Sequence, residues 1–286
     1  MHVSSLTPKV GLHVSISKSL ASSFDIAKEI GCDTFQIFTR NPRGWKFKHL
    51  LLDEIKAFKE KQEQAGITPV LSHMPYLPNL ASPNRDIYKK SVETLTSEVD
   101  RCGKLGIQYV VTHLGSHLGE GQEMGLARLV AGLNTALSKS VNQVQILLEN
   151  MAGQKNSMGS RFEEIERIIE RVDQADRIGV CFDTCHAFAA GYELRSEKSL
   201  NETLSQIRKF LGVERIKAVH LNDSQGGLGS GLDRHEHIGL GYIGTKGFKL
   251  LLQNSLFRRL PLILETPIDD RMNDRENLNV VRKLAR

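Results

Sequence analysis

The segment RFEEIERIIERVDQADRIGVCFD, residues 161–183, shows the unit from which we expect the whole chain to be built. Its last six residues, IGVCFD, form a short apolar run that is typical of a buried strand, and this run ends at the carboxylate of Asp183. Its first half has helical spacing, because one face carries Phe162, Ile165, Ile168, Ile169 and Val172. The segment therefore predicts a helix, then a strand, then a polar residue at the carboxyl end of that strand.

The same order recurs nearer the amino terminus, in residues 51–73 (LLDEIKAFKEKQEQAGITPVLSH) and residues 91–113 (SVETLTSEVDRCGKLGIQYVVTH). In both segments the helical part stops at a glycine, Gly66 or Gly106, and the strand part ends at a histidine. Helices that stop at glycine and lead into apolar strands form half of a βαβ repeat. We therefore expect an α/β protein with parallel strands.

Eight apolar runs along the chain close with a polar residue, and the gaps between these residues are 26, 34, 40, 36, 34, 37 and 45. Eight equal βα units would be spaced by about 36 residues, so the spacing favours a (β/α)8 TIM barrel over an open, doubly wound sheet. We expect a single domain over residues 1–286. The eight residues are His13, Thr39, His73, His113, Glu149, Asp183, His220 and Glu265.

Composition excludes several classes of protein. Hydrophobic residues make up 40% and charged residues 25% of the chain, which argues against disorder. No apolar stretch approaches the ~18 residues of a membrane span, and the start of the chain lacks the apolar core of a signal peptide. The four scattered cysteines indicate a reduced, cytoplasmic protein. A net charge of +5 mildly favours an acidic partner such as nucleic acid.

Six of the eight predicted strand ends carry His, Asp or Glu, and the carboxyl ends of barrel strands meet at one mouth. Buried carboxylates and imidazoles in one place need a strong counter-charge. Divalent metal ions supply it, and mixed histidine and carboxylate ligands suit zinc or manganese. The six strand ends are His73, His113, Glu149, Asp183, His220 and Glu265.

Two further clusters add candidate ligands. His186 follows Asp183 by three residues, and Asp233 and His235 are two apart, so in an extended segment they point the same way. His237 could replace His235 by the same spacing. Nine ligands with a bridging carboxylate can hold up to three ions of about four ligands each. Adjacent metal ions are the standard device for displacement at a phosphodiester.

Several segments of the chain resemble those of a known family. GVCFDTCHAFAAGY, VHLNDS, DRHEHIGLG, LLENMAGQ, FQIFTRNPRGW, VTHLGSH and LILETP, which together span nearly the whole chain, are similar to motifs of endonuclease IV. This resemblance implies a three-zinc enzyme that hydrolyses double-stranded DNA 5′ to an apurinic or apyrimidinic site. It implies a 3′-hydroxyl and a 5′-deoxyribose phosphate as the products.

The resemblance also implies residue roles. His73 and His113 would hold a first zinc, with Glu149 bridging it to a second zinc that Asp183, His220 and Glu265 complete. His186, Asp233 and His235 would hold a third zinc. Manganese remains an alternative at these sites. A hydroxide between the first two ions would be the nucleophile, which makes Glu149 and Glu265 the catalytic carboxylates.

Loops after the second and third strands carry the expected DNA contacts. FTRNPRGW and HMPYLPNL are irregular and contain aromatic residues with no obvious core to join. By resemblance, Arg43, Tyr76 and Leu77 are the residues inserted into the kinked duplex, although the sequence alone allows ordinary loop packing equally well. His13, beside Ser15, is a weaker candidate for a contact on the phosphate side. We expect the enzyme to act as a monomer.

The sequence also allows two other functions, and it contains one motif that resembles a nucleotide-binding loop. A sugar isomerase would need one metal held by Glu149, Asp183, His220 and Glu265, and a protein that only binds damaged DNA would need no open zinc site. GLGYIG matches the G-x-G-x-x-G pattern of dinucleotide-binding folds. Because it follows the polar segment DRHEHI, we expect a loop instead. Cys181 and Cys185 are expected to be packing residues.

Overall fold

The computed structural model describes residues 7–286, in which eight parallel strands close into a barrel. The strand order around the barrel is β1-β10-β7-β6-β5-β4-β3-β2, and β1 pairs with both β2 and β10, so the sheet has no free edge. This confirms the predicted TIM barrel. The barrel strands are β1 (Val10–His13), β2 (Thr34–Ile37), β3 (Val70–His73), β4 (Tyr109–Thr112), β5 (Gln145–Glu149), β6 (Ile178–Asp183), β7 (Ile216–His220) and β10 (Leu262–Leu264).

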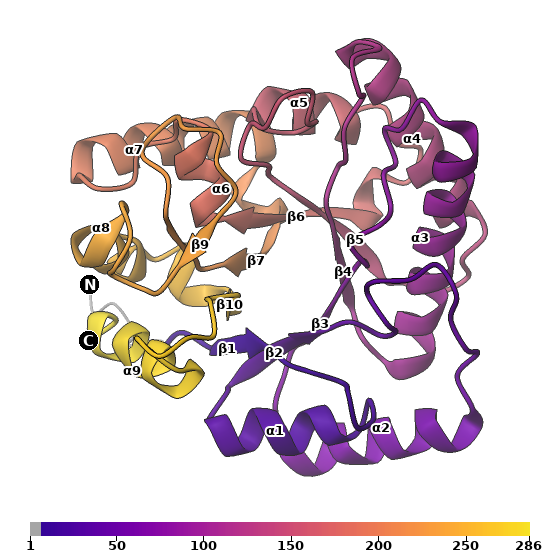
Figure 1. The fold of residues 1–286 in the computed structure, drawn as a ribbon, viewed down its shortest axis with the longest axis horizontal. Helices are drawn as coiled ribbons and strands as arrows, with labels where there is room; N and C mark the ends of the chain where they lie inside the picture. The colour runs from indigo at the N-terminus through magenta and orange to yellow at the C-terminus, as the bar shows by residue number, and fades with distance from the viewer. Residues whose placement is uncertain (1–6) are drawn as a thin grey trace.

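Helices connect successive strands and enclose the barrel, as Figure 1 shows. The helices α2 and α3 end at Gly66 and Gly106, where φ is 64° and 76°, a left-handed backbone that glycine adopts without strain. Both stops were predicted. The helices are α1 (Ser22–Ile30), α2 (Leu52–Ala65), α3 (Arg85–Leu105), α4 (Gln122–Ser138), α5 (Phe162–Ile169), α6 (Thr184–Ala189), α7 (Glu197–Gln206), α8 (Gly244–Gln253) and α9 (Asp274–Leu284).

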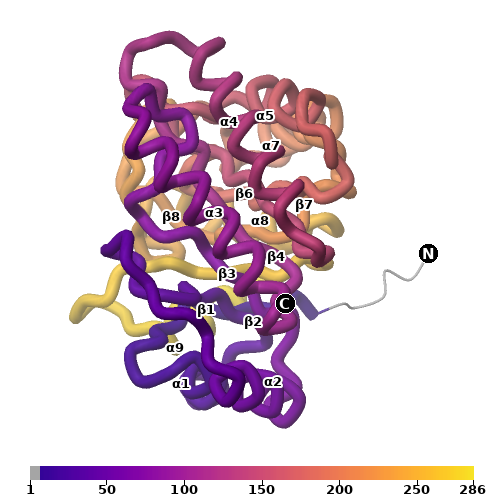
Figure 2. The backbone as a smooth tube through the Cα atoms, turned by 90° about the vertical axis from the view of Figure 1, so that its right-hand side faces the viewer, coloured from indigo at the N-terminus to yellow at the C-terminus, as the bar shows by residue number. Residues whose placement is uncertain are grey.

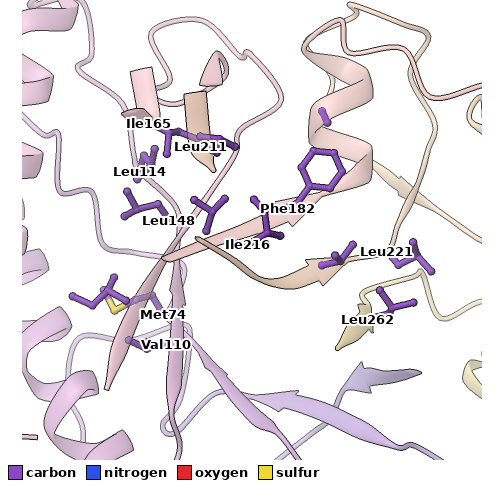
Figure 3. Packing of buried hydrophobic residues seen from close by; sticks show 14 of the residues in the cluster. Met74, Val110, Leu114, Leu148, Ile165, Phe182, Leu211, Ile216, Leu221 and Leu262 are labelled. Carbon is purple, nitrogen blue, oxygen red and sulfur yellow. The ribbon is translucent and has the colours of Figure 1, made fainter. Parts of the chain in front are cut away.

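The buried apolar residues form two separate clusters because successive strand residues point to opposite faces. The larger cluster lies between the strands and the helices, and Leu148, Phe182 and Leu262 in Figure 3 belong to it. The smaller cluster, here called the inner layer, lies inside the barrel and is fully buried. The inner layer consists of Leu71, Val111, Leu147, Cys181, Ala218 and Ile263.

Each inner-layer residue stands two positions before one of the six predicted ligands, for example Leu147 before Glu149. Residues two apart on a strand share a face, so the ligands form the next layer toward the carboxyl ends of the strands. The sequence of each of these strands thus places an apolar side chain inside the barrel and a polar side chain at its carboxyl end. The register places Asp183 directly opposite His220, but it places Glu149 opposite Cys181, two residues before Asp183. Neighbouring ligands are therefore level on some strand pairs and offset by two residues on others.

The connections at the carboxyl ends of the barrel strands contain secondary structure of their own. Between β7 and α8, two short strands, β8 (Asp223–Ser224) and β9 (His235–Glu236), form an antiparallel pair. In Figure 2 the yellow connection from β10 to α9 projects on the left, the side on which β8 also lies.

One predicted strand end was wrong. The strand β2 ends at Ile37, two residues before Thr39. Thr39 is instead drawn toward α3, where its hydroxyl donates to Glu98 Oε2 at 2.7 Å and accepts from Arg101 Nε at 2.8 Å. His113 and Glu265 each follow the last strand residue by one, and the other five predicted residues close their strands.

Candidate metal centre

Glu149 lies at the middle of the centre, fully buried at the end of β5. Its Oε2 is 3.2 Å from Nε2 of His73 and 3.2 Å from Nε2 of His113. Its Oε1 is 3.0 Å from Nδ1 of His220 and 3.3 Å from Nδ1 of His186. The two oxygens therefore face two different groups of imidazoles, which is the geometry that a bridging carboxylate needs.

Two groups of potential ligand atoms meet at this carboxylate. In each group the atoms all lie within 4.8 Å of one another. One group is His73, His113 and Glu149, and the other is Glu149, Asp183, His220 and Glu265. Both match the sets implied for the first and second ions.

A third group differs in one member from the expected set. Asp183, rather than Asp233, has a ligand atom within 4.8 Å of those of His186 and His235. Asp183 caps α6 by accepting from the backbone N–H of His186 at 2.7 Å, so its carboxylate lies between the second and third groups. Asp233 remains close, with its Oδ1 3.0 Å from His186 Nε2. All nine predicted ligands thus converge on one region.

Burial opposes the charge on the central carboxylates, but neighbouring imidazoles outweigh it. Burial alone would raise the pKa of Glu149, yet His220 and His113 hold that pKa well below its usual value of 4.5. The pKa of Glu265 is also held well below 4.5, mainly by the charge of His220, against the effect of burial. Both carboxylates are therefore anionic at neutral pH.

The imidazoles show the reciprocal effect. Burial alone would lower the pKa of His186, but Asp183 and Asp233 bring it well above 6.5. The pKa of His113 is raised by the Glu149 carboxylate, again against burial. The centre is a concentration of negative charge that requires nearby positive charge, which protons on imidazoles or bound cations supply.

In the part of the chain that the structure describes, two buried imidazole nitrogens of the third ligand group lack a hydrogen-bond partner. Nε2 of His186 and Nε2 of His235 are buried, and within residues 7–286 neither has a hydrogen-bond partner, although Asp233 Oδ1 is 3.0 and 3.7 Å away. A buried nitrogen without such a partner is costly unless its lone pair is bound. Imidazole and carboxylate donors suit zinc or manganese. These residues therefore fit divalent metal ions.

Buried amides that the sequence analysis missed hold the ligands in place. Asn222 Nδ2 donates to Asp183 Oδ2 at 2.8 Å, and Asn222 Oδ1 accepts from the backbone N–H of Glu265 at 2.8 Å. Asn150 Oδ1 accepts from the backbone N–H of Asp183 at 2.8 Å. Gln36 contacts both His220 and Glu265. A neutral amide adds no charge to the sequence pattern, so spacing does not distinguish these three residues.

The centre opens into a cavity of about 440 Å³ whose rim includes His13, Phe38, Tyr76 and Ile268. His13 lies at the end of β1, with its Nδ1 3.7 Å from Glu265 Oε1. Burial lowers the pKa of His13, against the effect of Glu265, so the imidazole is neutral at neutral pH. A molecule bound in this cavity beside Glu265 would therefore also contact His13.

The predicted DNA contacts lie on exposed loops beside this cavity. Arg43 is exposed, and Tyr76 and Leu77 are 65% and 40% exposed. The loops after β2 and β3 are joined because Tyr76 N donates to Pro42 O at 3.1 Å. The Phe38 ring supports Tyr76 edge-on, with ring centroids 5.1 Å apart. These large side chains are therefore presented to solvent rather than packed into the core.

A buried ion pair anchors the base of the loop that carries Arg43. Arg40 Nε donates to Glu98 Oε1 at 2.5 Å, and both side chains are buried. Arg101 extends the network by donating to the backbone carbonyls of Thr39 and Lys48. Two side chains of helix α3, Glu98 and Arg101, therefore hold the backbone at the start of this loop.

The glycine-rich segment GLGYIG, residues 239–244, is a loop, as predicted, but it leads into α8 at Gly244. Its amides are already occupied, because Asp223 accepts from the backbone N–H groups of Gly239, Gly241, Ile243 and Gly244 at 2.9 to 3.4 Å. A side chain of the protein thus fills the recess that a phosphate occupies in dinucleotide-binding folds.

His237 and the cysteines lie outside the ligand set. His237 Nε2 donates to Asp269 Oδ1 at 3.0 Å, and its Nδ1 accepts from Asn277 Nδ2 at 3.0 Å. His237 therefore does not replace His235. Cys181 and Cys185 are free and buried, which confirms that they are packing residues.

A Xylose isomerase-like TIM barrel is the family description that matches residues 24–284, in agreement with the observed barrel. No helix in residues 7–286 is long and apolar enough to cross a membrane. The fold and the ligand groups thus define a TIM-barrel protein with a candidate metal centre at the carboxyl ends of its strands.

Proteins of similar sequence show to which family of TIM-barrel proteins the chain belongs. "Probable endonuclease 4" of Methanoculleus marisnigri is 52% identical, over 96% of this chain and 98% of its own length. That of Nitrosopumilus maritimus is 51% identical, over 97% and 100%. The crystal structure of endonuclease IV from Thermus thermophilus is 36% identical, with a TM-score of 0.86 over 97% of this chain and 98% of that one. The chain belongs to the endonuclease IV family and is an endonuclease.

Proposed function

We propose that this endonuclease repairs DNA by hydrolysing the phosphodiester 5′ to an abasic site, leaving a 3′-hydroxyl and a 5′-deoxyribose phosphate. The observation that carries the proposal is the placement of Glu149, whose two oxygens face two adjacent groups of ligand atoms. Adjacent ions about 3.5–4 Å apart are suited to in-line displacement at phosphorus. Membership of the endonuclease IV family supports the same reaction.

Nine side chains would hold three divalent ions, with zinc favoured and manganese as the alternative. Such ions would lower the pKa of water to about 7, so that a hydroxide held between the first two ligand groups could be the nucleophile, and they would offset charge on the phosphate and the departing oxygen. The nine side chains are His73, His113, Glu149, Asp183, His186, His220, Asp233, His235 and Glu265.

The chain's own residues orient the reacting groups. Glu149 holds its two oxygens toward the two ligand groups because four imidazoles surround it. Glu265 directs Oε1 toward His13 and Oε2 toward His220. We propose Glu149 and Glu265 as the catalytic carboxylates, and neutral His13 as a donor to a phosphate oxygen beside them.

Recognition of the lesion is assigned to the exposed loops. Arg43, Tyr76 and Leu77 would insert into the duplex and fill the gap left by the missing base. Inserted side chains kink the duplex, and their contacts must offset an unstacking cost of a few kcal/mol per base step. The enzyme would act as a monomer, because all nine proposed ligands come from one chain.

The direct test is incubation of the full chain with a labelled duplex that carries one abasic analogue. We expect a single cut on the 5′ side of the analogue and a 3′ end that a polymerase extends without further processing. Excess chelator should stop the reaction, and an otherwise identical undamaged duplex should remain intact. Cleavage that persists in chelator, or a 3′ end that cannot be extended, would contradict the proposal.

Metal content separates this function from that of a sugar isomerase. An isomerase would use one ion at Glu149, Asp183, His220 and Glu265, which do form one group. It would leave His73, His113 and His235 without a role. We expect elemental analysis of the active protein to find close to three divalent ions per chain, whereas one ion per chain would favour the isomerase.

A further inference from the structure

Gln36 is a fully buried amide inside the barrel, and it contacts side chains at the carboxyl ends of three other strands. Its Oε1 lies 2.9 Å from Nε2 of His220 on β7. Its Nε2 lies 2.9 Å from Oε1 of Glu265, just after β10, and 3.0 Å from Nδ1 of His13 on β1. One side chain thus joins two members of the second ligand group to the imidazole at the rim of the cavity.

The direction of the amide is determined by its partners. An amide offers an accepting oxygen on one side and an NH2 donor on the other. With Oε1 facing His220, the NH2 group can donate to the Glu265 carboxylate and to His13 Nδ1. The opposite direction would set Oε1 against a carboxylate oxygen, with an acceptor facing an acceptor. Only the first arrangement satisfies all three contacts.

This direction selects the tautomer of His220. Because Gln36 Oε1 can only accept, Nε2 of His220 carries the hydrogen, and Nδ1 of the neutral ring keeps its lone pair. Nδ1 is the atom that faces the ligand group, 3.0 Å from Glu149 Oε1 and 3.3 Å from Glu265 Oε2. The ring nitrogen needed for ligation is thus the one left without a hydrogen.

The same amide also orients Glu265. Donation from Gln36 holds Glu265 Oε1 away from the ligand group, and Oε2 then faces His220 Nδ1 and Asn222 Nδ2, at 3.3 and 3.4 Å. The carboxylate therefore offers one defined oxygen to the group. A carboxylate free to rotate would offer either.

We propose that Gln36 is a positioning residue for the second metal site, where it fixes His220 as an Nδ1 ligand and Glu265 as a ligand through Oε2. The inference rests on the proposed function only in requiring a metal ion at this group. Partners of this kind fix the tautomer and direction of metal ligands, and their loss typically lowers metal affinity or activity by about 10–100-fold.

The test compares Gln36→Leu with Thr34→Val in the zinc-loaded full chain. Thr34 is the matched control because it is fully buried two positions earlier on the same strand, and its hydroxyl donates to Pro69 O at 2.6 Å rather than to a ligand. Each protein is dialysed against increasing concentrations of a chelator, and its zinc content is measured. We expect Gln36→Leu to lose one ion at about 10–100-fold lower chelator concentration than the unaltered chain, and Thr34→Val to retain zinc normally.

A second variant and a kinetic measurement complete the design. Gln36→Glu keeps the shape and the acceptor for His220 but loses the donor to Glu265, so it should also release zinc readily, even if Gln36→Leu does not fold. On abasic duplex we expect kcat to fall with KM nearly unchanged. Normal zinc retention by a folded Gln36 variant, or equal loss from Thr34→Val, would overturn the inference.

The outcome is separable from that of the proposed function. A chain that holds zinc but leaves abasic duplex intact would refute the function, while zinc retention would still decide the role of Gln36. Active wild-type protein with an unaffected Gln36→Leu variant would refute only the role of Gln36. A wild-type chain that binds no zinc would overturn both.

Discussion

Two layers inside the barrel differ completely in chemistry although they stand two residues apart on the same strands. The inner layer is apolar and fully buried, and its members contact one another. The ligand layer above it consists of imidazoles and carboxylates, and neighbouring charges displace the pKa values of Glu149, His186 and Glu265 from their usual range. On β5 the change from Leu147 to Glu149 marks the boundary.

The difference shows how one fold separates stability from chemistry. Apolar contacts in the inner layer stabilise the barrel and fix the spacing of its strands, and they require no ligand. The ligand layer concentrates buried charge, which is unfavourable unless cations balance it. Changes in the two layers should therefore have different consequences, even on one strand.

Glu149→Gln should have the largest effect, because it removes the charge between two ligand groups while keeping the size of the side chain. We expect the rate of abasic-site cleavage to fall by at least about 10²–10³-fold, as electrostatic groups of this kind commonly contribute that much. Binding to abasic duplex should be largely retained. Single-turnover kinetics and a binding titration would measure the two quantities.

The control for this variant is His49→Ala, which changes an exposed histidine outside the ligand groups. We expect its cleavage rate to be close to that of the unaltered chain. A Glu149→Gln protein that retained near-normal turnover would show that the central carboxylate does not bridge the two groups.

Leu147→Ala, two residues earlier on β5, should show the opposite pattern. Leu147 is fully buried in the inner layer, and Leu-to-Ala changes in cores lower the free energy of unfolding by about 2–5 kcal/mol. We expect denaturant titration to show this loss, whereas metal content and cleavage per folded molecule at low temperature should change little. Loss of metal without loss of stability would mean that the layers are not separable.

The pH dependence of stability should reverse when metal is removed. In metal-free protein, the raised pKa values of His186 and His220 contribute stability that is present below pH 6.5 and lost as pH rises through the folded-state values. The lowered pKa of Glu149 contributes stability that is present above pH 4.5 and lost as pH falls through its folded-state value. Chelated protein should therefore lose thermal stability as pH rises from 6.5 through these folded-state values.

Metal-loaded protein should gain stability over the same range, because metal ions compete with protons for the imidazoles and bind more tightly as pH rises. Thermal unfolding with chelator and with excess zinc, over the same pH series, would show the crossing. Parallel curves in the two conditions would mean that no ion replaces these protons.

The smallest effect is expected above the ligand layer, in the exposed loops. Tyr76→Ala combined with Leu77→Ala should weaken binding to abasic duplex measurably, because the inserted side chains no longer offset the unstacking of the base step. Binding to undamaged duplex rests on phosphate contacts and should be spared. Titration of both duplexes at one salt concentration, with metal content as control, would measure this. Equal loss on both duplexes would rule out insertion.

The sequence predicts most of the ligand layer because charged residues at the ends of apolar runs are conspicuous and regularly spaced. It does not distinguish Gln36, Asn150 or Asn222, since a neutral amide in or just after a strand carries no pattern of its own. Thr39 was misplaced for a related reason. Its hydrogen bonds to Glu98 and Arg101 depend on tertiary packing against α3, which a local pattern does not contain.

Asp223 acts as a non-covalent staple on the longest connection at the mouth of the barrel. Its carboxylate joins position 223 to backbone amides 16 to 21 residues further along the chain. Asp233 and His235 lie inside the loop that it closes. The entropy lost in closing such a loop is lost once, when the chain folds. The third ligand group is therefore assembled in advance, and an arriving ion need not order the segment that binds it.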